Sequence, residues 1–479
     1  MKTKSPRFLE RKVMEKLVSW KGDPLRKALL MEGCRQTGKT RTLLEFAEKE
    51  YESYAYFNLE TDVKTRGLFE GDNRTADFLL KRLSYDESQV ELIPGKSAII
   101  LDEIQASPGA YSALKTLSLD GRYDILASGS LLGTMVGDLQ RLSPMGYVDI
   151  VELRSMDFEE FLWAIGYTHE QTGYVRDCIR NGEPIDDFIL GRISDHFRTY
   201  MTVGGMPEAV LTYVETKDYV QVRKSLSRII DVVRRDAEKY SSKTDRLRIG
   251  KCFDSIPAQL ASANKKFTYS RIEKKKGSGK RVYGDSLLWL ERAGLVEYCH
   301  NLEEPVSPLA ARVKPSSFKI YMADTGILTA MMEPKVAADI VNRDAHANNG
   351  SVVENAVACA LVRNGYPLYF YERSHSTLEV DFIINCEDGV VALETKSGRN
   401  KRAKSLRRLF AVEKKVARGI KLSEGNVFTD DNGIENYPLF APCFFDDSAD
   451  VLKEIGFQDI GPLKERFDEV LRSRRNAGV

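Results

Sequence analysis

Long apolar runs are missing from this chain of 479 residues. No stretch approaches the roughly 18 consecutive apolar residues that a membrane helix needs, so no membrane-spanning segment is expected. Residues 1–20 are charged and amphipathic and contain no apolar core of a secretory signal. We therefore expect a cytoplasmic protein without a membrane partner.

Cysteine pairs and histidine clusters are also lacking. The seven cysteines are scattered, odd in number and form no C-x-x-C pair. This arrangement disfavours a disulfide framework or a zinc knuckle and is typical of reduced cytosolic thiols. The five histidines are equally dispersed, so a metal site built from histidine is not expected.

An excess of charge of one sign is absent as well. The 71 basic and 70 acidic residues give a formal net charge of +1, so no global positive field indicates a nucleic-acid partner. Two local runs, at 265–281 and 396–408, are strongly basic. Such runs are most often solvated faces, and contact with DNA is the alternative that they leave open.

The chain does have enough length for two to four domains. Its apolar fraction of 42% and charged fraction of 29% are typical of soluble globular proteins. After an amphipathic helix at 8–20, strand patterns alternate with helical ones over residues 22–165, which predicts an α/β domain with a mainly parallel sheet. The expected strands are 28–31, 54–57, 97–101 and 123–127.

The pattern changes twice along the rest of the chain. Residues 186–245 are helical in pattern, with an interruption at 203–207, and residues 350–445 return to α/β. Between them, 248–305 has the outline of a winged helix. Its expected recognition helix, 281–293, holds few cations, so DNA binding and protein docking are equally open for it. The other expected elements are helices at 250–262, 269–275 and 351–364, a hairpin at 295–302, and strands at 368–371, 379–385 and 390–396.

A phosphate-binding motif follows the first strand. Residues 33–40, GCRQTGKT, match G-x-x-x-x-G-K-[ST] in full, between an apolar strand and a helix. The glycines allow a turn whose N–H groups converge on phosphates at a helix N-terminus. Lys39 would place its charge on the β- and γ-phosphates of ATP, and the Thr40 hydroxyl would ligate Mg²⁺. The expected nucleotide site comprises Gly33, Cys34, Arg35, Gln36, Thr37, Gly38, Lys39, Thr40 and Arg41.

Two further strands end in residues that suit the same site. The strand at 99–101 runs into Asp102 and Glu103. Asp102 would lie by the Mg²⁺ ion, and Glu103 would polarise the attacking water. The alternative is an ordinary strand with a polar C-terminal edge. The phosphate-binding motif upstream makes this alternative weaker. The strand at 123–127 is followed by Ser128-Gly129-Ser130, where a hydroxyl, with Ser130 as the candidate, would sense the γ-phosphate. Serine and glycine are also ordinary turn residues.

A family resemblance is carried by GCRQTGKTRTL (33–43), YFNLE (56–60), ILDEIQ (100–105), SGSLLG (128–133), MDFEEFL (156–162), VGGMPEAV (203–210), YMADTGIL (321–328) and residues 350–398. Together these resemble prokaryotic AAA+-superfamily ATPases that carry a C-terminal conserved domain of unknown function, over nearly the whole chain. The resemblance implies that Arg35, Gln36, Asn58 and Gln105 form or support the nucleotide site. Many relatives have Gly-Arg or Gly-Lys where this chain has Gly146-Tyr147. The resemblance therefore does not imply a cationic sensor or trans-acting residue at this position.

Three acids and a lysine stand out near the C-terminus. Asp381 and Glu394 lie 13 positions apart, which fits neighbouring antiparallel strands, and Glu394 and Lys396 project to one face. These acids and Glu354 can share a metal ion, while the lysine orients water or stabilises a phosphate. The pattern resembles PD-(D/E)XK nucleases, with Val380 in place of the proline, and implies a restriction-endonuclease-like α/β fold. An ion cluster that neither binds metal nor cleaves is the alternative.

Two functional hypotheses follow for an α/β protein with an AAA+-like P-loop NTPase domain. In the first, ATP turnover with Mg²⁺ gates a C-terminal half that binds DNA and cleaves it; the intact acids favour this. In the second, the chain is a regulatory switch whose C-terminal half binds a partner protein or a second copy and cuts nothing; the near-neutral charge favours this. The expected domains are an ATPase domain at 1–165, a helical extension at 166–245, a winged-helix-like region at 246–335 and a nuclease-like domain at 336–479.

Overall fold

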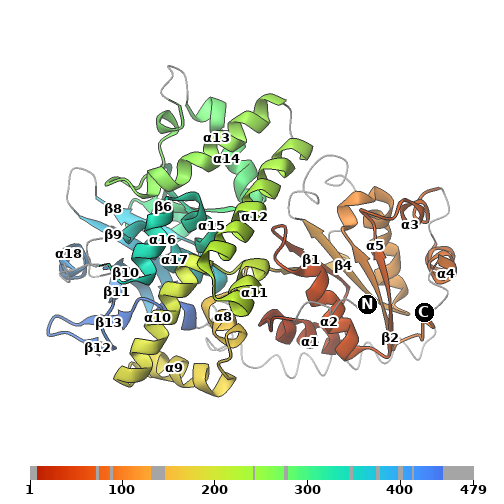
Figure 1. The fold of residues 1–479 in the computed structure, drawn as a ribbon, viewed down its shortest axis with the longest axis horizontal. Coiled ribbons are helices and arrows are strands. Elements are labelled where there is room, and N and C mark those ends of the chain that lie inside the picture. The colour runs from red at the N-terminus through yellow and green to blue at the C-terminus, as the bar shows by residue number, and fades with distance from the viewer. Residues whose placement is uncertain are drawn as a thin grey trace. The chain divides into compact units, whose positions relative to one another are not determined.

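The computed structural model of the protein forms two compact units (Figure 1). Unit 1 comprises Met1–His169, His196–Tyr298 and Ile320–Ala347, and unit 2 comprises Glu170–Asp195, Cys299–Lys319 and Asn348–Val479. None of the described helices is long and apolar enough to cross a membrane. The structure describes residues 8–71, 75–86, 90–130, 146–240, 243–273, 279–344, 349–373, 378–396, 403–412 and 415–445.

The N-terminal part of unit 1 is built on a parallel sheet (red to orange in Figure 1). Its five strands follow the order β2-β3-β4-β1-β5, and every pairing in it is parallel. All four predicted strands are confirmed, but β5 was not predicted because its side chains are largely half-exposed and its sequence alternates with acids. The strands are β1 (Ala28–Gly33), β2 (Ser53–Asn58), β3 (Ser97–Asp102), β4 (Asp124–Ser130) and β5 (Val148–Glu152).

Helices cover both faces of this sheet. Leu29 and Met31 of β1 pack with α1 and α2, while Ala28 and Leu30 pack with α4 and α5. Strands buried on both faces read as continuous apolar runs, so polar side chains collect where these strands end. The helices are α1 (Val13–Gly22), α2 (Lys39–Glu50), α3 (Val63–Gly67), α4 (Ala76–Asp86) and α5 (Pro108–Asp120).

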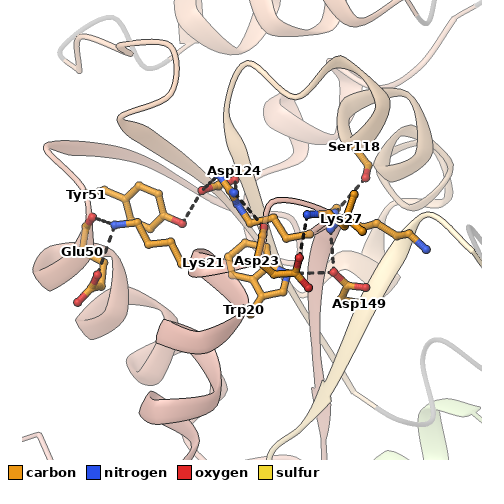
Figure 2. A network of polar contacts seen from close by, with 12 residues as sticks. Trp20, Lys21, Asp23, Lys27, Glu50, Tyr51, Ser118, Asp124 and Asp149 are labelled. Carbon is orange, nitrogen blue, oxygen red and sulfur yellow. Dashed lines mark hydrogen bonds and ion pairs between the residues drawn. The ribbon is translucent and has the colours of Figure 1, made fainter. Parts of the chain in front are cut away.

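Polar contacts close the edge of the sheet where the strands begin. Figure 2 shows Asp124, the first residue of β4, receiving hydrogen bonds from Arg26 Nε at 2.8 Å and from the Tyr51 hydroxyl at 2.9 Å. Asp149 of β5 accepts from Trp20 Nε1 at 3.1 Å and from the backbone N–H of Lys27 at 2.7 Å. Burial raises the pKa of Tyr51, and Asp124 raises it further, so this hydroxyl remains a donor. The network fixes the start of the sheet, opposite the end that carries the phosphate-binding loop.

Glycines allow three stretches of unit 1 to meet at one junction. A Cβ atom at Gly205 would collide with the carbonyl oxygen of Met156, and one at Gly204 would collide with Asp324. The buried Asp324 accepts a hydrogen bond from the Gly205 N–H at 2.8 Å. The junction thus joins the residues before α8 to those between α10 and α11 and to the start of α15. These helices are α8 (Phe158–Ala164), α10 (Asp187–Val203), α11 (Pro207–Thr216) and α15 (Thr325–Met331).

The middle of the chain holds helices where a winged helix was predicted, but the predicted hairpin at 295–302 is wrong. That segment is a single strand, β6, which lies between β7 and β8. Its sequence, VEYCHNL, has no glycine or proline to support a tight turn. The elements here are α9 (His169–Asn181), α12 (Tyr219–Tyr240), α13 (Lys243–Leu260), α14 (Lys280–Arg292), β6 (Val296–Leu302), β7 (Val313–Met322) and α16 (Pro334–Val341).

The second sheet is mixed, with the order β12-β13-β11-β10-β9-β8-β6-β7. The predicted hairpin of β9 and β10 is confirmed as an antiparallel pair. Helix α17 is buried from Ser351 to Leu361, while α18 packs Leu406 and Leu409 against Val390 of β10. The elements are α17 (Gly350–Arg363), β8 (Tyr369–Glu372), β9 (Glu379–Cys386), β10 (Gly389–Thr395), α18 (Lys404–Val412), β11 (Val416–Ser423), β12 (Phe428–Thr429) and β13 (Ile434–Pro438).

Candidate nucleotide-binding site

The phosphate-binding motif forms a loop between β1 and α2. Gly33 ends the strand, and a Cβ atom there would collide with the carbonyl oxygen of Leu153. Gly38 precedes α2 with a left-handed φ of 94°, and no side chain caps the helix there. The first N–H groups of a helix have no partner within it and carry partial positive charge. The loop therefore presents an uncapped helix N-terminus of the kind that binds phosphate.

Lys39 lies inside this loop and is buried. Its Nζ donates to the carbonyl oxygens of Gly33 at 3.0 Å and Cys34 at 2.8 Å. Burial lowers the pKa of Lys39, although Glu103 and Asp102 act in the opposite direction. Within the described part of the chain, no carboxylate lies within ion-pair distance of this ammonium group, and its hydrogen bonds go to two neutral carbonyl groups.

Asp102, at the end of β3, receives hydrogen bonds from hydroxyl groups on three elements. Thr40 Oγ1 lies 2.9 and 3.0 Å from its two carboxylate oxygens, the Tyr56 hydroxyl lies 2.8 Å away, and Ser128 Oγ also donates to it. Burial raises the pKa of Tyr56 to about 12, and Asp102 contributes to the rise. The structure thus brings together Thr40 and Asp102, the two residues predicted to hold Mg²⁺, on neutral donors that leave the carboxylate charge in place.

Glu103 follows in a left-handed conformation, with φ of 55°. Its N–H donates to Ser128 Oγ at 3.1 Å, and Gln105 Nε2 donates to its carboxylate. The amide oxygen of Gln105 in turn accepts from the Ser130 N–H at 3.3 Å. A non-glycine residue in this region costs about 1–3 kcal/mol and is most frequent at functional sites. Gln36 of the loop, with φ of 63°, is a second such residue at this site.

Two residues of the site were not singled out by sequence analysis: Tyr56 and Arg11. Tyr56 stands two positions before Asn58 on β2, so both side chains can reach Asp102 from one face of the strand. This two-residue spacing was the sequence signal that could have identified Tyr56. The buried Arg11 donates to the Thr37 carbonyl at 2.9 Å and forms an ion pair with Glu160 at 3.2 Å. No spacing in the sequence connects Arg11 with a loop 26 residues away.

Two other residues predicted for the nucleotide site have no contact with Lys39 or Asp102 among the interactions described above. Arg41 bonds Glu45 one turn along its own helix, at 3.1 Å, and Gln36 is exposed. At the position where relatives carry a cation, the ring of Tyr147 lies 4.5 Å from Lys115 Nζ. Residues 131–133 of the SGSLLG stretch lie outside the described residues.

In unit 2, four carboxylates that we call the acidic cluster (Glu354, Glu379, Asp381 and Glu394) are associated with two lysines. Glu394 pairs with Lys396 at 2.5 Å, as the strand alternation predicted for one face. Asp381 instead accepts from the N–H and hydroxyl of Thr395.

The second lysine, Lys319 of β7, was not predicted. Its Nζ lies 3.2 Å from Glu354 and 3.0 Å from Glu379. Among the residues described, no group of three histidine, cysteine or acidic side chains is arranged to hold a metal ion. The predicted metal ligands Glu354, Asp381 and Glu394 are therefore not gathered into such a group, because each carboxylate already has other partners.

The basic runs predicted to contact DNA are only partly described. Residues 274–278 and 397–402 lie outside the described segments. In the remainder, Arg407 bonds Asp430 at 2.7 Å, and Arg281 at the start of α14 is exposed.

Three family models match parts of the chain. Residues 25–162 match an AAA domain, and residues 194–337 and 349–440 match two domains of unknown function, DUF8612 and DUF4143. The first match agrees with the five-stranded parallel sheet and the phosphate-binding loop: the N-terminal part of the chain has a P-loop ATPase fold. No curated protein sequence matches the chain significantly.

Solved structures were compared as well. The Aeropyrum pernix ORC1 protein in complex with DNA is 11% identical, with 71% of this chain and 94% of that chain covered and a TM-score of 0.27. Cdc6p from Pyrobaculum aerophilum is 14% identical, with 71% and 97% covered and a TM-score of 0.25. The S. cerevisiae Hsp104–ADP complex is 12% identical, with 60% and 40% covered and a TM-score of 0.28. Such scores do not establish a shared overall architecture.

Proposed function

We propose that this chain binds ATP with Mg²⁺ at residues 33–40 and hydrolyses it. The observation that carries the proposal is the placement of the Lys39 ammonium on two loop carbonyls, beside Thr40 and Asp102. A cation held by neutral dipoles gains strongly from a polyanion, because charge-assisted hydrogen bonds are about twice as strong as neutral ones. A buried carboxylate held by hydroxyls likewise gains from a cation.

The roles divide among the residues of the loop and the strand ends. The helix N-terminus and Lys39 hold the phosphates, and Thr40 and Asp102 hold Mg²⁺, which would neutralise charge on the phosphate oxygens. Glu103 accepts a proton from water or polarises it, and Gln105 and Ser128 fix its position.

Phosphate release from Mg²⁺–ATP tests this proposal. We expect turnover by the full chain and a loss of about 10²–10³-fold in Glu103→Gln, which keeps the shape of the side chain but cannot accept a proton. ATP binding by Glu103→Gln, measured by calorimetry, should persist. Glu52→Gln is the matched control, because this exposed acid pairs only with Lys96 at the edge of the same sheet. Equal turnover in Glu103→Gln and Glu52→Gln would remove Glu103 from the proposal.

For the C-terminal half, we propose that it binds DNA under control of ATP turnover. Support comes from the basic runs at 265–281 and 396–408, since cations on phosphates release counterions and give salt-dependent affinity. DNA binding should therefore weaken steeply with salt, and neutralising Lys401–Arg408 should reduce that salt dependence. The alternative, a switch that docks on protein, would be favoured if the neutralised variant bound DNA with an unchanged salt slope.

A further inference from the structure

The most completely buried cation in the described residues of unit 2 is Lys319. Its side chain is 0% exposed, and so is the residue Glu354, its partner at 3.2 Å. A second carboxylate, Glu379, lies 3.0 Å from Nζ, and the ring of Phe370 lies 4.8 Å away. Two carboxylates thus lie within ion-pair distance of one buried ammonium group.

A buried ammonium group that lies among carboxylates balances their negative charge, as a bound metal ion would. Isolated buried charges are strongly destabilising, so buried acids require a metal ion or a basic side chain beside them. Here Lys319 comes from β7, while its partners come from α17 and β9. One positive group thus joins three elements of unit 2, which is the structural role that a shared metal ion has.

We propose that the ammonium group of Lys319 takes the place of a metal ion in the acidic cluster of unit 2, so that this cluster is complete without divalent metal. The contacts of the two remaining acids, Glu394 and Asp381, agree with this proposal. Glu394 is occupied by Lys396 and by the N–H of Leu406 at 3.2 Å. Asp381 Oδ2 accepts from the N–H and hydroxyl of Thr395, at 2.8 and 2.7 Å. Unit 2 is then a binding module that performs no metal-dependent cleavage.

Titration of Mn²⁺ into the full chain by calorimetry, without nucleotide, tests the proposal directly. The chain carries Asp102→Asn throughout, so that the nucleotide site contributes no metal binding. We expect no Mn²⁺ binding with Lys319 present. In Lys319→Met, the acidic cluster loses its cation and should gain Mn²⁺ binding that the parent chain lacks. Lys421→Met is the matched control, because this lysine also lies on the sheet near an aromatic ring and should leave Mn²⁺ binding unchanged.

Thermal unfolding separates loss of charge from loss of packing. Lys319→Met should lower the melting temperature of unit 2 by about 10 °C, because it removes the ion pair of the buried Glu354. Mn²⁺ should restore part of the lost stability. This should hold even if Lys319→Met folds only when Mn²⁺ is present. Lys319→Met combined with Glu354→Gln removes both charges and should be more stable than Lys319→Met alone, with little response to Mn²⁺.

Three results would overturn the proposal. The first is Mn²⁺ binding with Lys319 present that disappears in Asp381→Asn. The second is a double variant as unstable as Lys319→Met, or no recovery of Lys319→Met in Mn²⁺. The third is Mg²⁺- or Mn²⁺-dependent DNA cleavage by the wild-type chain that is lost in Lys396→Ala. Phosphate release by Lys319→Met, with Asp102 intact, should match the wild type, so failure here is distinguishable from failure of the ATPase assignment.

Discussion

Two buried lysines, Lys39 in unit 1 and Lys319 in unit 2, have opposite surroundings. Two carbonyl oxygens hold Lys39, whereas two carboxylates hold Lys319. Burial lowers the pKa of Lys39; for Lys319, burial also acts to lower the pKa, but its acidic neighbours raise it overall. A lysine held by neutral dipoles remains receptive to a phosphate, and a lysine held by acids is already neutralised. The partners, and not burial itself, distinguish a binding cation from a structural one.

The acids of the two regions show the same contrast. Asp102 is surrounded by hydroxyl donors from Thr40 and Tyr56, so its negative charge has no paired cation among its hydrogen-bond partners. Glu354 and Glu394 each have a lysine within 3.2 Å. Both regions contain acids and lysines in β-strand ends and helices, yet only the first is arranged to attract both a polyanion and a cation.

Among the variants that test this difference between the two regions, Lys39→Ala should have the largest effect. Removing the Lys39 ammonium group, which two loop carbonyls hold, should weaken ATP binding by about 100-fold or more, because it deletes a charge-assisted contact to the phosphates. Calorimetric titration of Mg²⁺–ATP measures it. Lys49→Ala, on the exposed side of the same helix α2, is the control and should bind ATP as the wild type does. An unchanged affinity in Lys39→Ala would contradict the site.

Asp102→Asn should have the next largest effect. The amide keeps the size of the side chain but cannot offer a negative charge, so Mg²⁺-dependent phosphate release should fall by about tenfold or more. Asp124→Asn is the matched control, since Asp124 lies at the opposite end of the same sheet (Figure 2). If both variants respond equally to Mg²⁺, the hydroxyl-bound carboxylate is not a metal ligand.

Sequence analysis could predict which residues gather at the proposed nucleotide site because their signals are local. The loop, Lys39 and the strand ending in Asp102 are each specified by a few consecutive residues. The role of Tyr56 and the contact of Ser128 with Asp102 were missed, since these residues come close to Asp102 only through the strand order β2-β3-β4.

Unit 2 was less accessible to prediction for the same physical reason. Antiparallel pairing of β9 and β10 followed from alternation and spacing, and was confirmed. Lys319 lies on β7, but its partners Glu354 and Glu379 come from α17 and β9, at least 35 residues farther along the chain. A lysine in a strand pattern reads as exposed, so burial of Lys319 carried no sequence signal. Sequence analysis singled out Glu354 as a metal ligand, and it did not predict that Lys319 lies beside it.

A smaller effect is expected at Thr395, which supports Asp381. Thr395→Val keeps the backbone N–H bond to Asp381 and removes the hydroxyl bond at 2.7 Å. Loss of one hydrogen bond to a charged group costs about 1.5–3 kcal/mol, so the melting temperature of unit 2 should fall by a few °C. Thr395→Ser retains the hydroxyl and should lose less. Equal melting temperatures for Thr395→Val and the wild type would show that this hydroxyl bond contributes nothing to the cluster.

The smallest effect concerns the pH dependence of unit 2 and Glu394. Burial raises the pKa of Glu394 above its ordinary value of 4.5, and Asp381 adds to the rise, while Lys396 opposes it. Between the ordinary and the raised pKa, the folded state binds more protons than the unfolded one. Stability therefore falls as pH increases through this window and levels off above it.

Glu394→Gln removes this dependence, because the amide stays neutral. The variant should match the wild type near pH 4 and melt up to about 3 °C higher at pH 7. Melting curves of unit 2 from pH 4 to 8 measure the difference. Glu435→Gln is the opposite control: Glu435 accepts two hydrogen bonds from Arg418 at 2.8 and 2.7 Å, so its variant should melt lower at pH 7. A lower melting temperature in Glu394→Gln at pH 7 would mean that the pair with Lys396 outweighs burial, and that the acidic cluster is held more tightly by its lysines than the direction of this pKa implies.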